Sequence, residues 1–139
     1  METIIAYTAG GAKGNPGPAA AGVYITDAKG KVVREVKQSL GNATSDFAEY
    51  YGVMLVLQTL QEIYNKKSKK IQFEIRLSSE LVQKQLSALE PIKEPGLVPM
   101  FIEIHNMKVA SFPYISFVHI NRAKNKEADR LVNEVLGNS

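Results

Sequence analysis

The chain has 139 residues, of which 45% are hydrophobic and 22% charged, as in a soluble domain that can bury its own core. It has no cysteine, so disulfides and thiolate zinc sites are excluded, and no apolar run approaches the roughly 20 residues that span a membrane. The net charge of +3 mildly favours a polyanionic partner.

The start of the chain and its even composition bear on location and domain organisation. The first residues, METIIAYT, include an acidic residue and lack the basic start and long apolar core of a signal peptide. With no membrane span, this predicts a cytoplasmic protein. Because there is no internal repeat, low-complexity segment or composition shift, residues 1–139 are predicted to form a single domain.

The first forty residues predict three strands joined by turns. Strand-forming residues occur over 3–8, 19–27 and 32–40. Glycine and proline predict turns over 10–18 and 28–31. Because the connections are short, we expect the three strands to pair antiparallel.

After residue 44 the hydrophobic spacing becomes helical, and helices then alternate with strands. Helices are predicted over 45–64, 78–90, 94–109 and 125–137, and strands over 71–77 and 114–120. Ser45 or Asp46 is the expected cap of the first helix, and Pro99 is expected in the first turn of the third. In the last helix Asn125 is the expected cap and Gly137 the expected stop. The order βββ-α-β-α-α-β-α predicts a mixed sheet with helices packed on its faces.

Two local motifs suggest anion binding and also have simpler readings. The densest basic run, NKKSKK over 65–70, is read as a solvated turn, with a polyanion contact as the alternative. The glycines between residues 10 and 17 precede a strand and not a helix, so the phosphate-binding loop motifs fail their context test. A hairpin turn explains these glycines at least as well.

Four stretches together resemble type 1 ribonuclease H, in the short bacterial and archaeal form that lacks the basic protrusion loop. They are YTAGGAKGNPGPAAAGV, ATSDFAEY, SSELVQKQL and HINRAKNKEADRLVNE, and they cover nearly the whole chain in the right order. The resemblance implies an α/β ribonuclease H-like fold, with a five-stranded mixed sheet and helices on both faces. It also implies cleavage of the RNA strand of an RNA/DNA hybrid with two Mg²⁺ or Mn²⁺ ions.

In this family four carboxylates hold the metals, and the chain keeps two of them. Glu49 stands in the AEY motif and Asp129 in the NxxAD motif. Ala9 stands where the family has the aspartate of TDG, and Ser78 where it has the aspartate of DSELV. Because alanine supplies no ligand and serine a neutral hydroxyl, we expect metal binding to be weak or absent and hydrolysis very slow or absent.

The resemblance also implies a nucleic-acid surface around these positions. Its residues are Gly11, Lys13, Asn15, Thr44, Ser45, Asp46, Ser79, Arg122 and Lys124. Asp46 departs from the usual TNN pattern and brings a negative charge to where a phosphate would approach. Of Tyr50 and Tyr51, we expect one to pack in the core and the other to face the cleft.

Each of these residues also has a purely structural reading. Glu49 and Asp129 suit the first turn of a helix, where the dipole favours acids, and Ser78 and Ser79 suit helix N-caps. The basic residues flanking the cleft, among them Lys126, suit a solvated surface equally well. The sequence leaves these alternatives open.

Three functional hypotheses follow. The preferred one is a monomeric ribonuclease H-like protein that binds an RNA/DNA hybrid or double-stranded RNA with little or no hydrolysis. The second is an active nuclease with one metal ion on Glu49, Asp129 and either Asp46 or Glu80. The third is a protein-interaction module on the same fold. The altered TSD triplet favours natural loss of the two aspartates over deliberate mutation.

Overall fold

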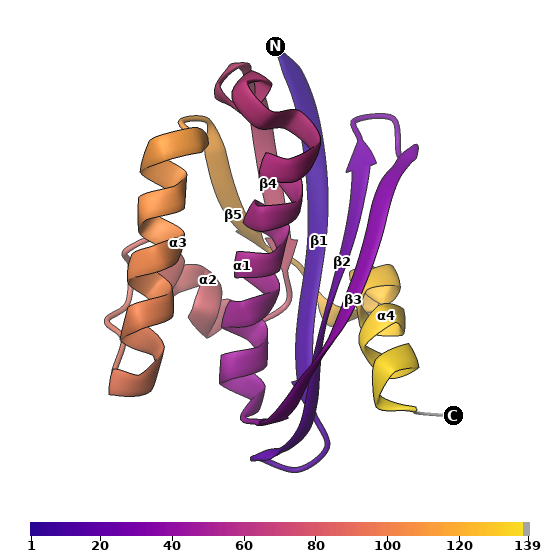
Figure 1. The fold of residues 1–139 in the computed structure, drawn as a ribbon, viewed down its shortest axis with the longest axis vertical. Helices are drawn as coiled ribbons and strands as arrows, with labels where there is room; N and C mark the ends of the chain where they lie inside the picture. Colours follow the sequence, from indigo (N-terminus) through magenta and orange to yellow (C-terminus); the bar gives the residue numbers. More distant parts are fainter. Residues whose placement is uncertain (138–139) are drawn as a thin grey trace.

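The computed structural model describes residues 1–137, and Figure 1 shows one sheet with helices on both faces. The five strands lie in the order β3-β2-β1-β4-β5. They are β1 (Glu2–Ala12), β2 (Gly17–Asp27), β3 (Val32–Ala43), β4 (Ile71–Leu77) and β5 (Ile115–His119). The predicted domain also includes residues 138–139, which lie outside the described residues.

Four α-helices cover the sheet, with α1, α2 and α3 on one face and α4 on the other (Figure 1). They are α1 (Ser45–Tyr64), α2 (Glu80–Leu86), α3 (Val98–Ser111) and α4 (Lys126–Leu136), with short 3-10 helices η1 (Asn65–Lys70), η2 (Pro95–Leu97) and η3 (Arg122–Lys124). This confirms the predicted α/β class and mixed sheet. Within residues 1–137, no helix is both long enough and apolar enough to cross a membrane.

Strand direction follows from the length of each connection. β1, β2 and β3 pair antiparallel through short turns, as predicted, whereas β4 and β5 lie parallel to β1 because helices make the crossovers. The carboxyl ends of β1 and β4 therefore meet at the same edge of the sheet.

The sheet separates two apolar cores of different size. The larger lies between the sheet and α1, with Ile4 and Ala6 of β1 facing it. The smaller lies under α4, and Ala9 belongs to it. The alternation of side chains along a strand thus places Ala9 on the α4 side of β1.

The helix and strand bounds correct several sequence predictions. The bounds of α1 are as predicted, but its N-cap is Thr44, whose hydroxyl accepts the Phe47 N–H at 3.1 Å, so the prediction of Ser45 or Asp46 as the cap is wrong. The first hairpin is tighter than predicted, because β1–β2 pairing continues to Ala12 opposite Ala19. The strands therefore occupy most of the predicted turn.

The second half of the chain differs mainly in helix length. The predicted helix over 78–90 ends at Leu86, and the backbone then enters the left-handed region at Ala88, with φ +61. The helix predicted over 94–109 begins as the 3-10 turn η2 and continues as α3 to Ser111. Gly137 ends α4 with φ +70, which confirms the predicted stop.

Candidate active site

The carboxyl ends of β1 and β4 bring two of the four predicted metal positions together. The parallel pairing of these strands ends at Thr8 opposite Leu77. The next residues along each strand, Ala9 and Ser78, are therefore neighbours at this edge of the sheet. Ala9 is buried, and its methyl group packs in the apolar cluster with Ala20, Ala128 and Val132.

Glu49 reaches the same edge because α1 packs directly on β1 at a glycine. A Cβ atom at Gly10 would lie 2.2 Å from the carbonyl carbon of Ala48 and 2.4 Å from the backbone nitrogen of Glu49. Only glycine permits this approach. The backbone N–H of Gly10 in turn donates a hydrogen bond to the Glu49 carboxylate.

The start of α4 is fixed to β1 by a buried amide. Asn125 is 1% exposed, and its Nδ2 donates to the carbonyl oxygen of Thr8 at 2.9 Å. Its side chain makes no capping bond, although Asn125 holds the N-cap position of α4. This contact sets the first turn of α4, which carries Asp129, beside the end of β1. Asp129 Oδ1 lies 3.4 Å from Arg122 Nη2.

The Glu49 carboxyl is the most perturbed acid of the site. Burial raises its pKa from 4.5 to about 7, and the negative charges of Asp46 and Asp129 raise it further, against the hydrogen bond from Gly10 and the charge of Arg122. Its Oε2 atom is buried and has no hydrogen-bond partner within residues 1–137. Without a bound cation, burial therefore favours the protonated form of Glu49.

This raised pKa makes the stability of the protein depend on pH. Between pH 4.5 and 7 the folded state binds more protons than the unfolded state, so the free energy of unfolding falls as pH rises and levels off above pH 7. Glu49→Gln keeps the shape of the protonated carboxyl without the charge. We expect this variant to match the wild type at pH 4 and to be up to about 3 kcal/mol more stable at pH 8.

Urea unfolding at a series of pH values in the presence of a chelator measures the effect. Glu103→Gln is the matched control, because Glu103 is exposed on α3 and forms no ion pair within residues 1–137. A constant stability difference between Glu49→Gln and wild type from pH 4 to pH 8 would contradict the raised pKa.

The donor set does not fit a pair of Mg²⁺ ions. Glu49 and Asp129 are the two acids at the four positions, and within residues 1–137 no three His, Cys, Asp or Glu side chains form a group that could hold a metal. Of the two alternative ligands, Glu80 forms an ion pair with Lys84 at 3.0 Å, whereas the negative charge of Asp46 acts on Glu49.

Three predicted nucleic-acid contacts have structural tasks in this region. Asn15 Oδ1 accepts the Ser45 N–H at 3.0 Å and so ties the glycine-rich hairpin to the start of α1. Thr44 caps α1, and Ser79 caps α2 by accepting the Val82 N–H at 3.3 Å. The two hydroxyl groups keep a hydrogen to donate, so a role toward phosphate stays a prediction.

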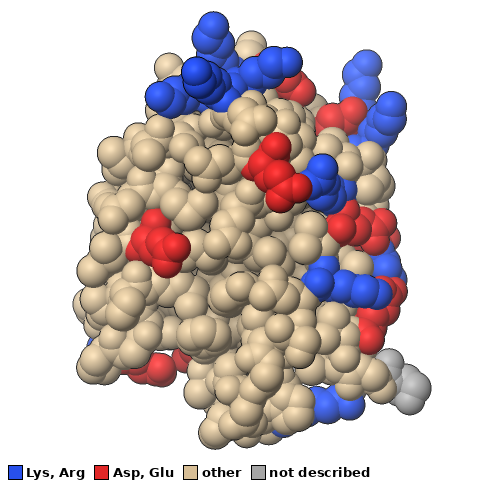
Figure 2. Space-filling view, in the orientation of Figure 1, with Lys and Arg blue, Asp and Glu red and all other residues tan. Residues whose placement is uncertain are grey.

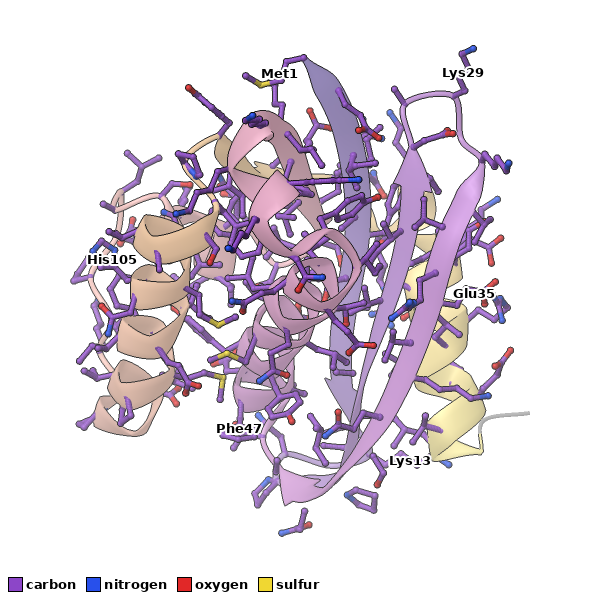
Figure 3. All side chains as sticks on the ribbon, turned by 45° about the horizontal axis from the view of Figure 1, so that its top comes forward. Met1, Lys13, Lys29, Glu35, Phe47 and His105 are labelled. Atoms are coloured by element: carbon purple, nitrogen blue, oxygen red, sulfur yellow. The ribbon has the colours of Figure 1, made fainter. Side chains whose placement is uncertain are left out.

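The predicted basic contacts do not all lie at the same end of the molecule. Lys13 lies in the turn between β1 and β2, at the same end as Phe47 near the start of α1, whereas Met1 and Lys29 lie at the opposite end (Figure 3). Arg122 is held near Asp129. Lys124 lines a pocket of about 220 Å³ on the α4 side of the sheet with Tyr7, Tyr24 and Gly30, so it lies toward the turn between β2 and β3.

Asp46 and the two tyrosines of α1 face different neighbours. Asp46 and the buried Tyr50 line a pocket of about 250 Å³ beside α2. Tyr50 packs in the core, where its hydroxyl donates to Gln85, and burial raises its pKa to about 12. The hydroxyl of Tyr51 accepts from Gln38 of β3 at 2.8 Å, so that tyrosine faces β3.

Two residues that build the site are not evident as site residues from the sequence. Gly10 belongs to the glycine- and proline-rich stretch that predicts a turn, although it lies within β1 under α1. Asn125 has the sequence context of a cap, although its amide joins α4 to β1. A signal for Asn125 is present in the sequence, because it is the first residue of the NxxAD motif that also contains Asp129.

Comparisons with known proteins agree on one family. The family model described as reverse transcriptase-like matches residues 7–135. Ribonuclease HI of Halobacterium salinarum is 32% identical over 133 residues, which are 96% of this chain and 64% of that protein. The bifunctional protein Rv2228c of Mycobacterium tuberculosis is 30% identical over 134 residues, again 96% of this chain but 35% of that protein. The chain thus spans about a third of the mycobacterial relative.

Solved structures extend this similarity to the whole fold. LC11-RNase H1, isolated from compost by a metagenomic approach, has a TM-score of 0.94 and 42% identity, covering 99% of this chain and 97% of that one. The same protein in complex with an RNA/DNA hybrid has a TM-score of 0.90 and 44% identity, covering 94% of each chain.

Proposed function

The chain belongs to the reverse transcriptase-like family of ribonuclease H-fold proteins, and on this premise we propose that it binds RNA/DNA hybrids but cleaves their RNA strand very slowly or not at all. Binding is supported by the similarity to LC11-RNase H1, which is known in complex with such a hybrid. The weak or absent cleavage is supported by one observation in the site itself. Of the four positions expected to hold metals, only Glu49 and Asp129 are acids, whereas Ala9 and Ser78 follow the end of the pairing between β1 and β4.

The chemistry of the reaction explains why two acids are too few. In this family two divalent ions activate the attacking water and stabilise the leaving oxygen, and their positive charges require several close carboxylates. Here the methyl group of Ala9 and the hydroxyl of Ser78 replace two of the charges. The residues present therefore do not fit a pair of Mg²⁺ or Mn²⁺ ions.

Three expectations from the sequence remain predictions of this proposal. They are a cytoplasmic location, a monomeric state and natural loss of the two aspartates. The nucleic-acid contacts predicted at Gly11, Ser45 and Ser79 belong with them.

Preference for a hybrid over a DNA duplex of the same sequence tests the binding proposal. Fluorescence anisotropy with a labelled hybrid of about 15 base pairs, duplex DNA and duplex RNA, in the presence of a chelator, measures the three affinities. We expect the hybrid to bind tightest, because the three duplexes carry similar backbone charge and only the cleft distinguishes their shapes. Between 50 and 200 mM salt, affinity for the hybrid should fall about ten- to fortyfold if two or three phosphates are contacted.

Variants near the cleft provide the control for this preference. Lys13→Gln/Arg122→Gln should reduce the preference for the hybrid, whereas Lys29→Gln/Lys31→Gln, at the far end of the sheet, should not (Figure 3). Tighter binding of duplex RNA would assign the cleft to that substrate. Equal affinity for all three duplexes, unchanged by Lys13→Gln/Arg122→Gln, would contradict hybrid recognition.

A further inference from the structure

The strongest basic feature of the molecule lies away from the candidate active site. Four of the six residues of η1 are lysines: Lys66, Lys67, Lys69 and Lys70. The whole chain has a net charge of +3 and these four contribute +4, so the rest of the protein has a net charge of −1. Figure 2 shows blue side chains gathered at the end of the molecule where α1 ends in Figure 1. We refer to residues 65–70 as the lysine turn.

The geometry of the lysine turn presents all four charges to solvent. In a 3-10 helix, residues three apart lie on the same side, so Lys66 aligns with Lys69 and Lys67 with Lys70 in two adjacent rows. Ser68, the one buried residue of the turn, donates its hydroxyl hydrogen to the Ser111 carbonyl oxygen at 2.8 Å. This bond fixes the turn to the end of α3.

The four ammonium groups have no partner that would explain their number. None forms an ion pair with a carboxylate of residues 1–137, and the ion pairs in that part of the chain all engage other cations. The dipole of α1 is equivalent to only about half an elementary charge at its carboxyl end and acts within the last turn, so it does not explain four cations. Four aligned like charges instead repel one another, and a bound polyanion would relieve that repulsion.

An open groove lies beside the lysine turn. It has a volume of about 690 Å³. Its lining includes Tyr64, Gln61, Asn65 and Ser111 as well as three of the four lysines, Lys66, Lys67 and Lys69. The amide and hydroxyl groups are suited to hydrogen bonds with sugar and phosphate oxygens, and a half-buried tyrosine is suited to contact with a base or sugar.

The lysine turn is also independent of the candidate active site. Helix α1 has 20 residues, which corresponds to about 30 Å between the active-site end and the lysine turn. Screening reduces interactions between exposed charges over about 8 Å at physiological salt. A duplex phosphate held at the carboxyl end of β1 therefore gains little from these lysines through long-range attraction.

From the charge, the alignment and the groove, we propose that the lysine turn binds the phosphate backbone of a single nucleic-acid strand, at a site separate from the candidate active site. The proposal does not require hybrid binding in the cleft. Together, the two sites would let one molecule hold a hybrid and a single strand at the same time.

Binding of a labelled single strand of about 12 nucleotides, as RNA and as DNA, tests the proposal in anisotropy titrations with a chelator. The wild type should show a slope of log affinity against log salt near −3, because four contacts contribute about −0.7 each. Lys66→Gln/Lys67→Gln/Lys69→Gln/Lys70→Gln should bring the slope near zero and weaken binding at 50 mM salt at least about tenfold. Because all four side chains are exposed, the variant should keep the wild-type circular dichroism spectrum.

A charge-matched pair separates a specific site from net charge. Lys67→Gln/Lys70→Gln removes one row and should about halve the slope. Lys29→Gln/Lys31→Gln removes the same charge from another exposed turn and should leave the slope unchanged. Equal effects of the two pairs, or unchanged binding by the quadruple variant, would overturn the proposal, as would lysine-dependent binding to anionic vesicles without binding to either strand.

The same titrations distinguish this proposal from the proposed function. If the quadruple variant loses single-strand binding but keeps its preference for a hybrid over duplex DNA, the lysine turn is a separate site. If that preference disappears as well, the turn belongs to the hybrid-binding surface and the two sites are not separate. Single-strand binding without any hybrid preference would support the lysine turn and count against hybrid recognition.

Discussion

Restoring two carboxylates, with Ala9→Asp/Ser78→Asp, is expected to produce metal-dependent cleavage of the RNA strand of a hybrid, at least about 10³-fold faster than the unmodified chain. Two ions held between four acids lower the barrier by several kcal/mol, and each 1.4 kcal/mol corresponds to a factor of about ten in rate. The backbone positions are already in place, because Ala9 and Ser78 follow the last paired residues of β1 and β4. Glu49 and Asp129 supply the other two acids.

The stability of the double aspartate variant is also expected to depend on Mg²⁺. Ala9 is 5% exposed and packs among alanine and valine side chains, so an aspartate there without metal buries a charge and destabilises the fold. Bound Mg²⁺ offsets that charge and stabilises the folded state by mass action. We therefore expect Mg²⁺ to raise the melting temperature of the double variant and to leave that of the unmodified chain unchanged.

A cleavage assay on a labelled hybrid, with Mg²⁺ or Mn²⁺, measures the gain. The matched control is Ala9→Asn/Ser78→Asn, whose side chains have nearly the same volume as aspartate but no charge. This variant should not cleave the hybrid. If the double aspartate variant binds metal but does not cut, the surface that docks the hybrid has been lost. If the unmodified chain cuts well, two acids suffice for catalysis and the proposed loss of hydrolysis is wrong.

Gly10→Ala is expected to destabilise the protein by about 3 kcal/mol or more, a large part of the stability of a typical domain. The added methyl group would lie 2.2 Å from the Ala48 carbonyl carbon and 2.3 Å from its oxygen, within the backbone of α1. Neither the central strand nor the helix is able to move without disturbing the large core between them.

Urea unfolding measures this loss, with Gly96→Ala as the control. A Cβ atom at Gly96 would have no atom within 4 Å, so that variant should change stability by less than about 1 kcal/mol. The Gly10→Ala variant should also lose hybrid binding in proportion to any shift of α1, because Glu49 and Thr44 lie at that end of the helix. An equal, small effect of both substitutions would show that α1 and β1 do not approach as closely as the structure has them.

The sequence by itself determined the order and type of the main elements. The helical spacing of apolar residues over 45–64 predicts α1 with its observed bounds, and strand-forming residues indicate all five strands. Glycine and proline mark the first hairpin and the end of α4. These features are local, because periodicity and turn chemistry act between residues a few positions apart. The motifs are equally local, and their order along the chain indicates the family.

Tertiary structure decided what particular residues do at the site. Asn125 has the sequence of a helix cap, yet its amide binds the Thr8 carbonyl, 117 positions away along the chain. The sequence alone suggests that Glu49 is an ordinary acid in the first turn of a helix, yet burial under the end of β1 raises its pKa to about 7. Gly10 reads as a turn residue, yet it is the contact between β1 and α1.

The same distinction applies to the lysine turn. Its charge is visible in the sequence, but the sequence does not reveal that residues 1–137 provide no acidic partner, nor that Ser68 fixes the turn beside a groove at the end of α3. Burial, desolvation and pairing depend on segments that folding brings together from distant parts of the chain. Composition and spacing therefore determined which chemical groups are present, and packing determined their protonation, their partners and their accessibility.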